Sequence, residues 1–325
     1  MSQNSLVVPN GTGASVRSAL NNALDTLKTQ NSGSSAPGTT SAYMLWADTT
    51  NDLLKIRNAA DSAWITIGRL SLTNLGLSPI SRGDLWGMTL SNNGTDATND
   101  IDVSAGSCAS DDATDANRVL LNPGALTKQI DAVWAAGNAA GGRISSESLV
   151  DGTWHVYAFR RSGGSDDVCL SQSLTPSLPD SGTNKRRIGS LVRKAGAILG
   201  FVQHGDWFVW KTLQVDMNIA AMASTATDIT LTVPTGIQVV ARFNVVIQTG
   251  SGPSYIRVWQ KDQTDLNATA NTSSNTLIRA TNSSWGGMYQ LLTDTSGRVR
   301  YDCDLAGDDI SVTTEGFVDQ RGRLL

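Results

Sequence analysis

Three short apolar runs separated by turn residues occupy residues 43–68 and strongly limit how this stretch can fold. It reads "YMLWADTTNDLLKIRNAADSAWITIG". Leu54 and Ile56 alternate with Lys55 and Arg57, and the segments "DTTND" and "AADS" are rich in turn-forming residues. The connections are short, so consecutive runs can lie side by side. The stretch therefore predicts a β-meander of three strands.

A helix is predicted over residues 14–30, directly before the meander. Ser15 is the predicted N-cap. The apolar residues recur at the i, i+3, i+4 and i+7 spacing of one helical face: Val16, Ala19, Leu20, Ala23, Leu24 and Leu27. The face is narrow, and an isolated helix of about four turns is only marginally stable. Two packing arrangements stay open: against the following strands, or against copies of the same helix around an axis.

The rest of the chain is typical of a protein built from many short strands. Charged residues make up 17% of the sequence, and Glu147 and Glu315 are the only glutamates. Ser, Thr, Asn and Gly replace the missing charge, which disfavours long solvated helices. Turn signals recur every eight to fourteen residues after residue 216, which predicts a sandwich, with residues 293–299 ("TDTSGRV") as a hairpin tip.

The middle of the chain also predicts strands. Residues 152–160 are expected to be covered on both faces, and "QHGD" at 203–206 is expected to be a hairpin turn. One short helix is predicted within 124–142, from the spacing of Leu126, Ile130, Val133 and Trp134. We predict a mainly β protein with one N-terminal helix in three parts: a helix-plus-meander module (1–80), a β-rich body (81–215) and a β-sandwich-like domain (216–325).

Charge and cysteine content exclude several classes of protein. The net charge is −4, and the one basic cluster, residues 185–187 ("KRR"), is interpreted as the solvated start of a strand, so no nucleic-acid partner is expected. Cys108, Cys169 and Cys303 have neither disulfide nor metal-binding spacing. The N-terminus does not resemble a signal peptide and no apolar run is long enough to span a membrane, so we expect folding in a reducing cytoplasm and no membrane insertion.

No strong catalytic motif is present, and we predict a protein that is not an enzyme, without catalytic residues, cofactor or metal. His155 is expected to be packed inside a strand, and His204 to be a turn residue. Paired carboxylates could serve a glycosidase or a Ca²⁺ site, but we interpret them as charges at strand edges. These pairs are Asp166 with Asp167, Asp302 with Asp304, and Asp308 with Asp309.

The nine tryptophans are expected to lie mostly in strands and in the core. Trp285 differs, because polar residues and glycines surround it in "NSSWGGMYQ". We predict that Trp285 and Tyr289 are exposed contact residues.

The N-terminal sixty residues resemble a module near the N-terminus of fibre and appendage proteins of tailed bacteriophages. The matching elements are the helix "VRSALNNALDTL", the link "NSG" to "APGTT", and the strands "WADT", "LLKIRN" and "WITIG". The segments "WHVYAFRRS", "RRIGSLVR", "FVQHGDWFVW" and "LTVPTGIQVVARFNV" resemble the β-rich body of such fibres. The two similarities together cover roughly two-thirds of the chain.

This resemblance implies a virion structural protein assembled in the bacterial cytoplasm. Such proteins are usually homotrimers with the N-terminal part attached to the particle, at the tail, near the portal or on the capsid. The anchoring and oligomer-forming residues are then Val16, Leu20, Leu24, Leu27, Trp46 and Trp64. The distal domain would contact host-surface polysaccharide or protein.

Two alternatives follow from the same resemblance. The chain could be a capsid decoration, head fibre or tail adaptor with a purely structural role. It could also be a polysaccharide depolymerase acting through paired Asp residues, although the chain lacks a long repetitive shaft and is poor in Glu.

Overall fold

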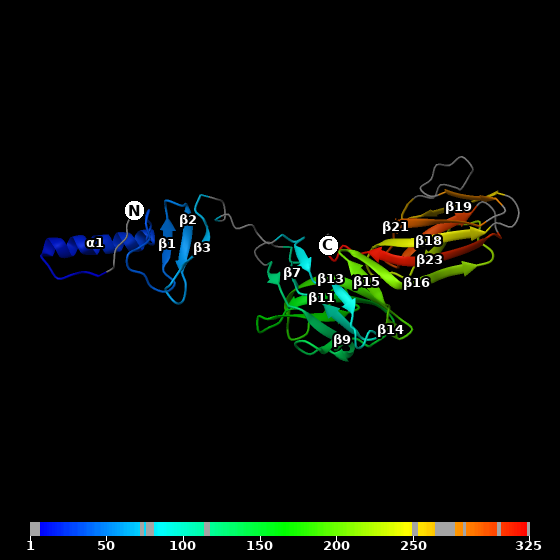
Figure 1. Ribbon diagram of the computed structural model, residues 1–325, viewed down its shortest axis with the longest axis horizontal. Coiled ribbons are helices and arrows are strands. Elements are labelled where there is room, and N and C mark those ends of the chain that lie inside the picture. The colour runs from blue at the N-terminus through cyan, green and yellow to red at the C-terminus, as the bar shows by residue number, and fades with distance from the viewer. Residues whose placement is uncertain are drawn as a thin grey trace. The chain divides into compact units, whose positions relative to one another are not determined.

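The computed structural model describes residues 7–71, 75, 81–113, 118–248, 253–263, 277–281, 284–303 and 307–323. It confirms a mainly β protein with an N-terminal helix and sandwich-like packing of sheets (Figure 1). The chain divides into two compact units, Met1–Pro79 and Ile80–Leu325. The predicted division between residues 215 and 216 falls inside strand β16 (Trp207–Ile219), which continues through it.

The helix α1 (Gly13–Thr29) begins two residues before the predicted N-cap Ser15. Thr12 is the N-cap instead: its hydroxyl oxygen accepts a hydrogen bond from the Ser15 backbone N–H at 3.3 Å. The prediction of Ser15 was wrong because both residues carry a suitable hydroxyl, and only the backbone geometry decides which one precedes the first turn. The helix ends at Gln30, whose backbone is left-handed with φ 50°.

The three-stranded meander is confirmed. Its strands pair antiparallel in chain order: β1 (Leu45–Asp48), β2 (Leu53–Arg57) and β3 (Trp64–Arg69). Asp48 stabilises the first turn, because its carboxylate accepts hydrogen bonds from the Asn51 backbone at 3.1 Å and from Lys55 Nζ at 2.8 Å.

The second unit begins with a small sheet and a large one. The small sheet has the order β4 (Leu85–Gly87), β7 (Gly106–Ala109), β8 (Leu120–Leu121). The eight-stranded sheet has the order β14 (Ala197–Ile198), β13 (Thr183–Lys194), β11 (Gly152–Arg160), β12 (Asp166–Ser171), β10 (Ala140–Arg143), β9 (Leu126–Val133), β6 (Asp100–Val103), β5 (Leu90–Asn92). Residues 153–159 of β11 are all buried, so the expectation that both its faces are covered is confirmed.

The short helix predicted within 124–142 is wrong. Residues 126–133 form strand β9, and 140–143 form strand β10, which pairs parallel to it. Leu126, Lys128 and Ile130 are buried in alternation, which is the period of a strand. The error has a simple cause: apolar residues four apart, such as Leu126 and Ile130, satisfy both a period of 2 and a period of 3.6.

Two further sheets face each other as a sandwich. One has the order β15 (Phe201–His204), β16, β23 (Asp309–Val318), β18 (Val240–Gln248), β21 (Ser284–Leu292). The other has the order β17 (Thr227–Thr230), β22 (Arg298–Cys303), β19 (Pro253–Trp259), β20 (Leu277–Thr281). Buried residues of both sheets, such as Phe243 and Tyr301, belong to one apolar core that continues to Trp154 of the large sheet.

One of the two predicted hairpins is confirmed. Strands β15 and β16 pair antiparallel around Gly205 and Asp206, as "QHGD" predicts. Residues 293–299 do form a tight turn, in which the Gly297 N–H donates to the Asp294 carbonyl oxygen at 3.0 Å. The hairpin predicted there is wrong, because β21 and β22 on either side enter different sheets. The turn instead carries the chain from one sheet of the sandwich to the other. Burying apolar side chains of both sheets in the shared core outweighs pairing β21 with β22.

Candidate functional site

The helix α1 presents an apolar row that its own unit leaves uncovered. Leu20, Leu24 and Leu27 lie at i, i+4 and i+7, and their exposed fractions are 49%, 54% and 58%. The buried side of the helix carries small residues instead, Ala23 and Thr26. Of the residues predicted to form the anchor, Val16 is half-buried. A row of three leucines on a helix is what a helix–helix contact requires.

The meander places its two tryptophans on one face. The Trp46 and Trp64 rings are 5.2 Å apart between centroids and tilted by 57°. Lys55 Nζ lies 4.7 Å from the Trp46 ring centroid, and the Arg57 guanidinium lies 5.1 Å from that of Trp64. Trp46 is buried, and its indole N–H donates to the Gly33 carbonyl oxygen at 3.2 Å. The tryptophans are therefore partly covered by cations within the unit.

An aliphatic row crosses the opposite face of the meander. Leu45 pairs with Ile56, and Ile56 pairs with Ile65, so the three side chains lie side by side. None is buried, and Ile65 is 53% exposed. Within the described residues 7–71, the only buried apolar side chains are Ala23, Pro37 and Trp46. The N-terminal unit thus has apolar surface on its helix and on its sheet but almost no core.

The predicted contact residues Trp285 and Tyr289 differ in exposure. Both lie on β21, and Trp285 is 52% exposed. Tyr289 is half-buried: its ring lies 5.9 Å from that of Phe243, and burial raises the pKa of its hydroxyl to about 12. Sequence reasoning missed Trp86, which is 72% exposed on β4. The three-residue apolar run around Trp86 indicates a strand and gives no sign of which face is open.

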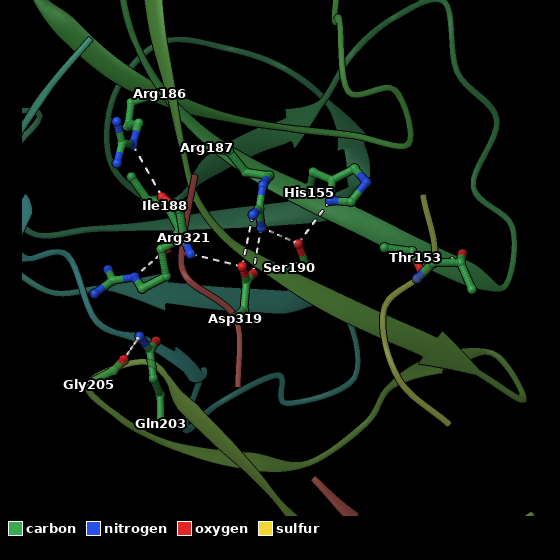
Figure 2. Close-up of polar contacts among 11 residues, drawn as sticks. Thr153, His155, Arg186, Arg187, Ile188, Ser190, Gln203, Gly205, Asp319 and Arg321 are labelled. Atoms are coloured by element: carbon green, nitrogen blue, oxygen red, sulfur yellow. Dashed lines mark hydrogen bonds and ion pairs between the residues drawn. The ribbon is translucent and has the colours of Figure 1, made fainter. Parts of the chain in front are cut away.

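A buried ion pair joins strand β13 to the end of β23 (Figure 2). Two nitrogens of the Arg187 guanidinium donate to the Asp319 carboxylate, at 2.5 and 2.8 Å. Arg187 also donates to Ser190 Oγ at 2.8 Å, and Ser190 Oγ lies 2.9 Å from His155 Nδ1. The Asp319 carboxylate further accepts the Arg321 backbone N–H at 2.8 Å. These five residues are all buried.

The environment of this network sets its protonation. Burial, and then the nearby Arg187 charge, lower the pKa of His155 to about 4, so the imidazole is neutral near pH 7. Burial opposes ionisation of Asp319, but the Arg187 charge, the hydrogen bonds from Arg187 and the Arg321 backbone N–H together lower the pKa of its carboxyl group. The Ser190–His155 contact resembles half of a hydrolase triad, but Ser190 is buried and already accepts from Arg187. The network fits a structural role better than nucleophilic catalysis.

The interpretation of the basic cluster as solvated is wrong. Arg186 and Arg187 are buried, and Lys185 is half-buried with its Nζ 3.6 Å from Asp111. Arg186 Nε donates to the Arg321 carbonyl oxygen at 3.2 Å. Sequence alone could not show this, because key partners are distant: Asp319 and Arg321 lie more than 130 positions later, and Arg82, whose carbonyl oxygen accepts from Arg186, lies 104 positions earlier.

The carboxylate pairs are used mainly in ion pairs. Asp166 bonds to Arg160 Nε at 2.9 Å, the buried Asp167 lies 2.9 Å from Lys128 Nζ, and Asp302 bonds to Arg257. Interpreting Asp166, Asp167 and Asp302 as edge charges was wrong, because their strands β12 and β22 lie inside their sheets.

The remaining carboxylates show no metal centre. Asp308 is buried, Asp309 is exposed, and Asp304 lies outside the described residues. In the part of the chain that the structure describes, no group of three or more His, Cys, Asp or Glu residues could hold a metal ion. No helix there is long and apolar enough to cross a membrane.

Comparison with known proteins gives no relative: no protein-family model matches the chain, and no curated protein matches it significantly.

Proposed function

We propose that the chain is a virion structural protein of a tailed bacteriophage, a short tail fibre or appendage attached to the particle through residues 1–80. The observation that carries the proposal is the small core of the N-terminal unit: between residues 7 and 71, the only buried apolar side chains are Ala23, Pro37 and Trp46. A unit with so little core gains stability when another protein surface covers its apolar rows.

The leucine row of α1 supports assembly with copies of the same chain. Leu20, Leu24 and Leu27 form one narrow stripe, and a narrow stripe suits contact between two or three equivalent helices around an axis. We propose a homotrimer on this basis. The aliphatic row of Leu45, Ile56 and Ile65 then remains to dock on another virion protein, at the tail, near the portal or on the capsid.

The second unit has a continuous core of its own, and we propose that it extends from the particle. Trp285 offers an exposed aromatic surface there, of the kind that binds sugars and proteins. We therefore propose a contact of this unit with host-surface polysaccharide or protein. A head fibre, capsid decoration or tail adaptor has the same kind of anchor, and the location on the particle separates these roles.

The test uses phage particles purified from the strain that carries the gene. Mass spectrometry should detect the chain, and a cryo-EM map should show three copies around an axis with residues 1–80 at the particle surface.

Variants test the leucine row. The double variant Leu20→Ser with Leu24→Ser should elute as a monomer in size-exclusion chromatography and be absent from particles. Leu213→Ser, at an exposed leucine of β16, should assemble normally. Particles without the chain, or a double variant that still assembles, would contradict the proposal.

A further inference from the structure

The second unit contains a pocket of about 460 Å³ at the junction of the large sheet and the sandwich. Its apolar walls come from several elements, and they include Leu174, Ile237, Val240 and Val318. This volume lies within the range of pockets that hold small molecules, and such pockets occur preferentially where two layers or domains meet.

The Arg187–Asp319 ion pair contributes to the lining of this pocket. Because the guanidinium and the carboxylate face each other at 2.5 Å, their charges cancel at short range. Gln238 and Gln320 are exposed members of the same lining and carry uncharged amides. A charged ligand would lose its hydration without meeting a free opposite charge, so the pocket favours an uncharged one.

We propose that this pocket binds a small uncharged molecule with an apolar body and a hydroxyl or carbonyl oxygen. The body packs between Leu174, Ile237 and Val240, and the oxygen meets the side-chain amide of Gln238 or Gln320. Leu174 lines the pocket and is 39% exposed, so a larger side chain there should occupy part of the pocket volume. The inference stands independently of the virion proposal, because it uses residues of the second unit only.

The test titrates the ¹⁵N-labelled full-length chain at pH 7 with three probes that share one ring: cyclohexanol, cyclohexylammonium and cyclohexanecarboxylate. The readout is the side-chain amide resonance of Gln238 together with the backbone amides of Gly236 and Gln320. Cyclohexanol should shift these signals saturably, and both charged probes should bind at least tenfold more weakly. No saturable shift with cyclohexanol, or equal binding of all three probes, would overturn the inference.

A variant pair separates binding in the pocket from binding elsewhere. Leu174→Trp should weaken cyclohexanol binding at least tenfold. Leu213→Trp adds the same side chain at an exposed leucine outside the pocket lining and should bind as the wild type does. Unchanged affinity in Leu174→Trp, or equal loss in both variants, would place the probe outside this pocket and refute the proposal.

Discussion

Asp319 is the carboxylate on which the buried polar network of the second unit depends. It neutralises Arg187 through two hydrogen bonds and accepts the Arg321 backbone N–H. Replacing it by alanine leaves the Arg187 cation buried without a counter-charge. We expect Asp319→Ala to lower the free energy of unfolding by about 3–5 kcal/mol, measured by chemical denaturation at pH 7.

A surface ion pair provides the matched control for this prediction. Asp111 and Lys185 are partly exposed and 3.6 Å apart, so Asp111→Ala should cost less than about 1 kcal/mol. Equal losses in Asp111→Ala and Asp319→Ala would show that burial of the Arg187 pair does not govern stability.

His155 makes stability depend on pH on the acidic side of neutrality. Its pKa is about 4 in the folded chain, against 6.5 for the ordinary side chain. As the pH falls, His155 therefore takes up a proton in the unfolded chain before it does so in the folded chain. Its contribution to stability is complete above pH 6.5 and is lost as the pH falls towards 4. The loss from this group should reach about 3 kcal/mol. Denaturation at several pH values between 7 and 4 measures it.

The two histidines can be separated by variants. His155→Gln should flatten the acidic slope, because the remaining side chain takes up no proton. His204→Gln, at the exposed last residue of β15 rather than in the hairpin turn where sequence placed it, should retain the wild-type slope. If the free energy of unfolding of His155→Gln still falls steeply between pH 7 and 4, the pH dependence belongs to the carboxylates instead.

At the scale of elements, the pairing of β16 with β23 depends on close backbone approach at Gly316. A Cβ atom there would lie 2.1 Å from the Phe208 carbonyl oxygen, which belongs to the backbone and cannot move aside alone. We expect Gly316→Ala to lower the free energy of unfolding by several kcal/mol, because the strands must separate locally. Gly163→Ala is the control, since its Cβ would meet nothing within 4 Å, and it should change stability little.

At the scale of the whole molecule, all residues of the two apolar clusters lie between positions 88 and 317. The second unit should therefore fold without the first. We expect a chain lacking residues 1–79 to unfold cooperatively within a few degrees of the same transition in the full chain, measured by calorimetry. It should also be monomeric by light scattering, because the leucine row of α1 is absent. A truncated chain that aggregates or unfolds without cooperativity would show that the N-terminal unit completes the core.

The sequence was informative wherever the deciding interactions are local. The meander follows from alternation and turns within residues 43–68, and the β15–β16 hairpin follows from "QHGD". The helix α1 follows from its apolar spacing, although its first turn begins at Thr12 rather than at Ser15. In each case the partner residues are close in the chain, so periodicity and turn chemistry carry enough information.

Tertiary structure decided what depends on distant partners. It made β9 a strand where the spacing of Leu126 and Ile130 fits either period, and it sent β21 and β22 into different sheets. Arg187, which the sequence predicts to be at the surface, is buried because the Asp319 carboxylate, 132 residues later in the chain, neutralises it. Sequence by itself thus determined the type of most elements and the apolar stripe of α1. The core, the buried charges and the pocket were decided by long-range packing, which local patterns do not encode.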